Sequence, residues 1–186
     1  MTSETQSDLP GGGGFEKRSL TARNLPTELG RVVRNGPALV RATRAGRVPH
    51  QLAEKLMLAT TAVNECRYCA RFHTHLAREA GIDDSVIDDI LERDVEAAID
   101  PGERTALLFA QHYAETDGEP SSEAVDALVD EYGAEMAADI RAYVRAIHFG
   151  NLLGNTVDAV RYRTRATVGG WVERCPRIRT VSRSRE

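Results

Sequence analysis

The sequence predicts an all-α fold, a compact array of about seven helices. From about Pro26 onward, apolar residues recur three and four positions apart, which is the spacing of helices with one buried face. No short run of β-branched residues alternates with polar ones between turn signals, as a half-buried strand would. Aromatic residues make up only 5% of the chain, so we expect a core of Ala, Leu, Val and Ile packed between helices.

In the first half of the chain, turn and cap residues divide the helical pattern into three or more segments. The segment that begins near Pro26 is expected to break at Gly36-Pro37. Pro49 suits the first turn of the next helix. Asn64 is then a candidate N-cap for a helix that ends at Gly81, a candidate left-handed C-cap.

Four further helices are expected to start near residues 85, 101, 122 and 134. The run Asp100-Pro101-Gly102-Glu103 is the strongest of these start signals. It offers an acidic N-cap, proline at the first helical position and a glutamate three residues after the cap. The last helix passes Gly150 and Gly154, which indicate close helix packing or a bend.

The composition divides the chain into three parts. Residues 1–19 are rich in Ser, Thr, Pro and Gly, so we expect a flexible N-terminal arm. Residues 20–160 are expected to form the helical domain. Residues 161–186 form a basic tail with eight arginines and two acids, whereas residues 1–160 carry a net charge of −10. We expect this tail to be a solvated extension that neutralises the acidic body or a neighbouring subunit.

The 186 residues, 41% of them hydrophobic, are enough for one globular domain without a metal or disulfide framework. The formal charge of −4 indicates no nucleic-acid partner. No apolar stretch approaches the roughly 20 residues of a membrane helix, and the N-terminus does not resemble a signal peptide. We therefore expect a cytoplasmic protein that binds neither nucleic acid nor membranes.

The informative motif is a pair of thiols. Cys66 and Cys69 form a Cys-x-x-Cys pair, whereas Cys175 stands alone. On a helix, Cys66, Cys69 and His73 share one face, where free N–H groups and an imidazole both favour a thiolate. Its place at the helix start favours Cys66 as the thiolate, whereas the four-residue spacing to His73 favours Cys69. The sequence therefore does not decide which cysteine is the thiolate. One thiolate could attack an oxidant while the other closes a disulfide.

Glu54 lies twelve residues before Cys66, on the preceding helix. If the two helices pack antiparallel, its carboxylate approaches the thiols or the imidazole and can orient the base. The alternative is a solvated surface charge, because buried acids are uncommon.

The pattern Glu-x11-Cys-x2-Cys-x3-His, with Tyr68 between the cysteines, resembles the active-site motif of the carboxymuconolactone decarboxylase superfamily, specifically its alkylhydroperoxidase D-like branch. The similarity runs from about His50 to Asp158. It implies an all-α fold, homo-oligomers and thiol-dependent reduction of organic hydroperoxides or hydrogen peroxide. From the residues themselves we expect neither a cofactor nor a metal. An external dithiol, on a lipoyl-bearing or thioredoxin-like protein, would restore the thiols.

The resemblance also implies a role for each site residue. Cys69 would attack the peroxide, Cys66 would resolve the product to a disulfide, and Glu54 and His73 would relay protons. The best-known branch has histidine where this chain has Tyr68, and tyrosine is a poor base near neutral pH. The decarboxylase branch lacks the cysteine pair, which counts against lactone decarboxylation here.

Other interpretations of the thiol pair fit less well. A structural zinc site needs four ligands, haem attachment needs a histidine where Ala70 stands, and thioredoxin chemistry needs a βαβ context. Two hypotheses stay open beside the peroxidase: a disulfide reductase or redox sensor without peroxide turnover, and a helical interaction protein with inert thiols.

Overall fold

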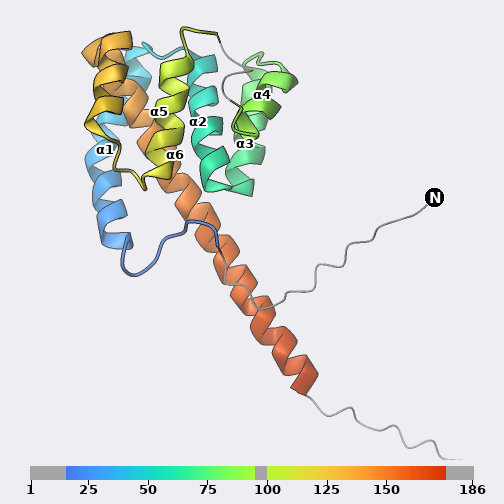
Figure 1. Cartoon of the computed structure of the whole chain (residues 1–186). Coiled ribbons are helices and arrows are strands. Elements are labelled where there is room, and N and C mark those ends of the chain that lie inside the picture. The colour runs from blue at the N-terminus through green and yellow to red at the C-terminus, as the bar shows by residue number, and fades with distance from the viewer. Residues whose placement is uncertain (1–15, 95–99, 175–186) are drawn as a thin grey trace, which may run out of the picture.

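The computed structural model describes residues 16–94 and 100–174, with residues 165–174 as backbone only, and this part of the chain is helical without any strand (Figure 1). Its helices, in chain order, are α1 (Leu25–Ala45), α2 (His50–Asn64), α3 (Arg67–Glu79), α4 (Asp84–Leu91), α5 (Arg104–Glu115) and α6 (Ser122–Arg174). The all-α prediction is confirmed. Cys175 and most of the N-terminal arm lie outside the described residues.

Helix α2 is the central element, packed against α3, α4, α5 and α6. Eleven of its fifteen residues are buried, which is the pattern of a helix enclosed on nearly all sides. The large side chains that fill the core around it are aliphatic, as the composition predicted: Leu56, Leu58, Ile87, Leu107, Leu128 and Ile140.

Helix α6 is long and changes direction once. At Gly133 the backbone has φ 73° and ψ 161°, a left-handed conformation that favours glycine, so the helix is interrupted there. This is where a new helix was expected, and counting the two parts separately gives the seven segments predicted. Figure 1 shows the second part running out beyond the helical body. The helix continues to Arg174, through the first half of the tail expected from residue 161.

The predicted break at Gly36-Pro37 is wrong, because α1 continues through Pro37. Proline leaves one carbonyl, that of Val33, without its helical hydrogen bond. Val33 is 68% exposed, so water can reach this carbonyl. Packing of α1 along α6 then holds the helix together across the proline.

Two predicted caps also lie elsewhere. Asn64 ends α2, and Cys66 rather than Asn64 is the N-cap of α3. Asp100 organises a turn before α5 by accepting from the Gly102 N–H at 3.0 Å, while Glu103 is the N-cap. Gly81 has the left-handed conformation expected after α3, with φ 81°.

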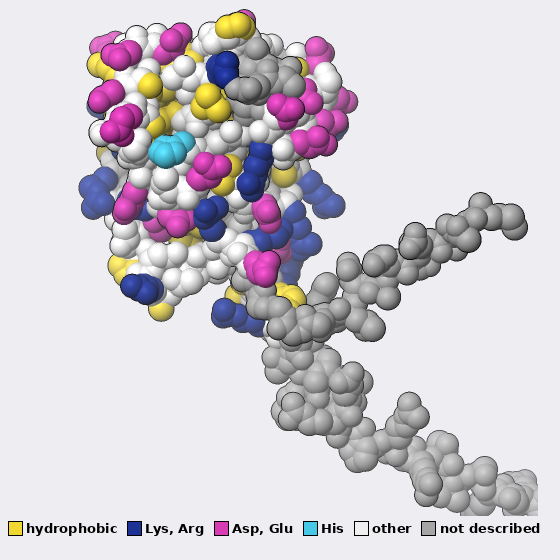
Figure 2. All heavy atoms as spheres, viewed as in Figure 1, with side chains coloured by type: hydrophobic (Ala, Val, Ile, Leu, Met, Phe, Trp, Pro, Cys, Tyr) yellow, Lys and Arg dark blue, Asp and Glu magenta, His cyan; other side chains and the backbone are white. Residues whose placement is uncertain are grey.

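The described end of the N-terminal arm contacts the helical body. Lys17 donates to the carbonyl of Glu65 at 3.0 Å, and the backbone carbonyl of Arg18 accepts from Nδ2 of Asn155 at 2.9 Å. On the face in Figure 2, acidic and basic side chains are interspersed, and acidic ones gather over α4. No helix of the described residues combines the length and the apolar character needed to cross a membrane.

Candidate active site

A two-residue connection folds α3 back along α2. Helix α2 ends at Asn64, Glu65 takes a left-handed conformation with φ 53°, and Cys66 then starts α3 in an extended conformation. This reversal makes the two helices antiparallel neighbours, which is the condition under which Glu54 was expected to approach the thiols or the imidazole. It therefore brings Glu54, ten residues before the end of α2, beside the middle of α3.

Glu54 and His73 form a buried pair. The Oε2 atom of Glu54 lies 2.8 Å from Nδ1 of His73, and the two residues are only 6% and 9% exposed. A carboxylate can only accept, so Nδ1 donates the hydrogen and Nε2 is left as the nitrogen able to take a proton. His50 approaches the other carboxylate oxygen at 3.7 Å. Glu54 is thus an orienting partner of the imidazole rather than a solvated charge.

Cys66 and Cys69 place their sulfurs 2.7 Å apart as free thiols. Because Cys66 is the N-cap of α3, its sulfur also accepts from the backbone N–H of Cys69 at 3.4 Å. Cys66 is fully buried, whereas Cys69 is partly exposed. Cys69 is therefore the sulfur that a substrate can reach.

The thiol pair ionises as a unit. The hydrogen bond with Cys69 is the main cause that lowers the pKa of Cys66 to about 6; burial opposes this change, and the N–H groups of Cys69 and Tyr68 support it. The same hydrogen bond, together with burial, raises the pKa of Cys69. At neutral pH the pair therefore holds one proton and one negative charge between two sulfurs.

Tyr68 belongs to a second group of side chains, which joins α3 to α6. Its hydroxyl donates to Oδ1 of Asp158 at 2.9 Å and accepts from Arg67 at 3.1 Å and from Arg161. Arg67 also binds Asp158 directly, at 2.6 Å. We call these four residues the α3–α6 clamp, and they fix the start of α3, where the sulfurs lie. Among the described residues, no hydrogen bond links Tyr68 to Glu54 or His73.

Gly154 of α6 lies against the thiols. A Cβ atom at this position would be 2.6 Å from the Cys66 sulfur, 3.8 Å from the Cys69 sulfur and 3.8 Å from the Tyr68 ring. Only glycine allows α6 this close, so Gly154 forms one wall of the thiol site. The sequence indicated close packing at Gly154 but not its partner. Asp158 and Arg161 follow Gly154 by one and two helical turns on the same face. This spacing is the feature of the sequence from which the clamp could have been predicted.

Buried amides support the connection that carries Cys66. Nδ2 of Asn155 donates to the carbonyl of Asn64 at 2.7 Å, and Nδ2 of Asn64 lies 3.2 Å from Nδ1 of His148. Burial lowers the pKa of His148 to about 4, so its imidazole is neutral at pH 7 and Nδ1 can accept this hydrogen bond. Sequence reasoning did not identify this network, because its members carry no local motif.

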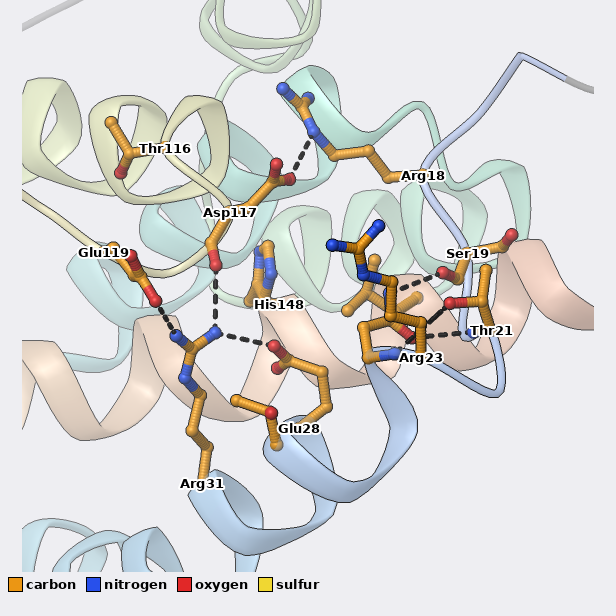
Figure 3. Close-up of a pocket in the computed structure, with 13 residues that line it drawn as sticks. Arg18, Ser19, Thr21, Arg23, Glu28, Arg31, Thr116, Asp117, Glu119 and His148 are labelled. Atoms are coloured by element: carbon orange, nitrogen blue, oxygen red, sulfur yellow. Dashed lines mark hydrogen bonds and ion pairs between the residues drawn. The ribbon is translucent and has the colours of Figure 1, made fainter.

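A polar cavity of about 730 Å³ lies apart from the thiols, between the N-terminal segment, the turn after α5, and α6. Figure 3 shows Arg31 held between Glu28, Glu119 and the carbonyl of Asp117, with His148 nearby. None of the predicted site residues lines this cavity. Within residues 16–94 and 100–174, no group of three or more His, Cys, Asp or Glu is placed to hold a metal ion.

The structure thus brings four of the five predicted site residues together as two pairs on α2 and α3, and places Tyr68 in the clamp beside the thiols. Residues 31–112, which contain all five, match the carboxymuconolactone decarboxylase family. No curated protein and no solved structure matches the chain. The matched segment, the helical fold and the motif agree with one another, and residues 31–112 are consistent with the carboxymuconolactone decarboxylase superfamily.

Proposed function

We propose that the protein is a thiol peroxidase of the alkylhydroperoxidase D-like branch, an oxidoreductase that reduces organic hydroperoxides or hydrogen peroxide. One observation carries this proposal: two free sulfurs lie 2.7 Å apart at the start of α3, and His73, one turn further along that helix, forms a buried pair with Glu54 of α2. This arrangement supplies an attacking sulfur, a resolving sulfur and a base within one helix.

The first step is attack by Cys69. Moving the shared proton from Cys69 to Cys66 over the short sulfur–sulfur contact makes the accessible Cys69 the thiolate. Its sulfur attacks the terminal oxygen of the hydroperoxide and the O–O bond breaks. The sulfur is oxidised to a sulfenic acid, and the peroxide leaves as an alkoxide that takes up a proton to form an alcohol.

The second step closes the disulfide. Cys66 loses its proton and its thiolate attacks the sulfur of the Cys69 sulfenic acid, which releases hydroxide; with that proton, this becomes water. The backbone N–H groups of Tyr68 and Cys69 at the start of α3, which stabilise the Cys66 thiolate, support this step. An external dithiol then reduces the disulfide by thiol–disulfide exchange and is itself oxidised.

Glu54 and His73 would move protons to and from the substrate. Among the described contacts, no hydrogen bond joins His73 directly to either sulfur. His73 follows Cys69 by one helical turn, so a peroxide or water between them would pass the proton to Nε2. Glu54 keeps Nδ1 protonated and stabilises the imidazolium that forms.

We also propose that the protein assembles into homo-oligomers. Leu25, Leu29 and Val33 follow one another at four-residue intervals on α1 and are 44%, 51% and 68% exposed. Leu153, Val157 and Val160 form a similar exposed row on α6. Apolar rows of this kind favour burial against another subunit. Sedimentation of the full chain tests this, and a monomer at micromolar concentration would contradict it.

The decisive experiment measures peroxide consumption by the full chain in the presence of a dithiol such as dihydrolipoamide. We expect catalytic turnover by the unchanged protein and none by Cys69→Ser. Turnover that survives this substitution would overturn the proposal. Rapid reduction of a disulfide substrate without any peroxide consumption would instead support the disulfide-reductase hypothesis.

A further inference from the structure

A second, smaller cavity lies where α1, the end of α5 and α6 meet. Its volume is about 320 Å³, and it is lined by Arg31, Arg34, Asn35, Tyr113, Gly118 and Arg145. Three of these six residues are arginines and none is acidic. No thiol or relay residue lines it, so its function is independent of the proposed peroxidase.

The positive charge in this cavity is only partly neutralised by the protein. Arg31 binds Glu28 at 2.6 Å and Glu119 at 2.8 Å, so its charge is compensated. Within the described ranges, no ion pair joins Arg34 or Arg145 to an acid. Burial and the neighbouring charge of Arg145 also lower the pKa of Arg141, whose buried Nε has no hydrogen-bond partner. Concentrating unpaired cations in this way is unfavourable unless an anion joins them.

The cavity is also shaped for a small ligand. Gly118 has φ 82°, and a Cβ atom there would lie 3.0 Å from Nη1 of Arg31 and 3.1 Å from the Tyr113 hydroxyl. The absent side chain therefore leaves the guanidinium and the phenol uncovered. Tyr113 is almost fully buried and Asn35 is 5% exposed, so both belong to a fixed wall.

We propose that this cavity binds the phosphate group of a small molecule. Two uncompensated guanidiniums match a group that carries nearly two negative charges at neutral pH. Guanidinium groups donate paired hydrogen bonds to phosphate oxygens, and the Tyr113 hydroxyl offers a further donor. The cavity volume exceeds that of inorganic phosphate, which leaves room for the organic part of a phosphate monoester.

Calorimetric titration of the full chain tests this, in buffer of fixed ionic strength without other oxyanions. The probes are inorganic phosphate and glycerol 3-phosphate, which separate the free ion from a monoester. We expect one site per chain that prefers the monoester. Equal affinity for both would assign the site to free phosphate and overturn the assignment to a small phosphorylated molecule.

Arg34→Gln is the informative variant, because Arg34 is exposed and its loss should not disturb folding. We expect it to weaken binding by about tenfold or more. Arg44→Gln is the matched control, since it removes the same charge from an exposed position on the same helix. Equal affinities for these two variants would overturn the proposal. An unchanged chain that binds neither probe would also overturn it. If the Arg34→Gln variant then sediments differently from the unchanged chain, acids of another copy fill the cavity instead.

Discussion

Gly154 on α6 approaches Cys66 so closely that a methyl group in place of its hydrogen would lie 2.6 Å from the sulfur. This contact joins the last helix to the N-cap residue of α3. Asp158, one turn further along α6, binds Tyr68 and Arg67 on α3. The position of the thiols therefore depends on the last helix, although every residue of the thiol motif lies on α2 and α3.

We predict that Gly154→Ala disrupts the thiol pair. The added carbon must push α6 or Cys66 away, and overpacking of this kind costs about 1–3 kcal/mol. Urea unfolding should show that loss, and peroxide turnover should fall with it. Gly150→Ala is the matched control, because its nearest contact would be 3.9 Å away, and it should be as stable as the unchanged chain or more so. Equal behaviour of the two variants would contradict the close approach.

Cys66→Ser should separate attack from resolution. If Cys69 attacks the peroxide, this variant still consumes about one equivalent of peroxide, because the sulfenic acid forms but cannot be resolved by its neighbour. Steady-state turnover should be lost. A dimedone adduct detected by mass spectrometry on Cys69 would check this. Cys175→Ser, the control, should turn over normally, and an adduct absent from Cys69 would count against the assignment.

Asp158→Asn should increase the acidity of the thiol pair. The carboxylate of Asp158 disfavours the Cys66 thiolate, so removing its charge should lower the pKa of Cys66 below its value of about 6. The ultraviolet absorbance of the thiolate against pH, in a Cys175→Ser background, measures this midpoint. Asp126→Asn, an exposed acid on α6, should leave it unchanged. A midpoint that rises in Asp158→Asn would refute the sign of this interaction.

Glu54→Gln should slow peroxide reduction without unfolding the protein. The amide keeps the size of the side chain but cannot stabilise a protonated imidazole, so we expect a loss of roughly 10- to 100-fold in kcat/KM. The pH profile of kcat/KM should change as well. A purely structural role of Glu54 would leave that profile unchanged. Glu79→Gln on α3 removes an exposed carboxylate that contacts His75 at 3.5 Å, and should have little effect.

His148 should make the protein sensitive to acid. Its pKa is about 4 in the folded state and near 6.5 when unfolded, so the unfolded chain binds more protons between these values. Its contribution to the free energy of unfolding, about 3 kcal/mol, is full above pH 6.5 and is lost as the pH falls towards 4. Urea unfolding across this range should show a shallower loss for His148→Gln than for the unchanged chain. The exposed His75→Gln should retain the full loss.

The sequence allowed Glu54 to approach His73 if their helices packed antiparallel, and the structure fulfils that condition. Both side chains lie on helices with clear periodicity, and the connection of two residues leaves antiparallel packing as the only short path. The prediction of a helix break at Gly36-Pro37 was wrong because it considered local sequence alone. Packing of α1 against α6 outweighs the local cost of proline, and that packing cannot be seen in residues 25–45 alone.

The sequence by itself determined the all-α fold and placed the thiol pair and His73 on one helical face, because helical periodicity and residue spacing act over a few turns. Only the family resemblance singled out Glu54 as a partner of His73. Tertiary structure decided which sulfur is buried and acidic, since this depends on the cap at Cys66 and its contact with Cys69. It also brought Gly154 and Asp158 to the site. Tyr68 and Asp158 are 90 residues apart, and no local propensity specifies a contact over such a separation. Only the packing of α6 against α3 creates it.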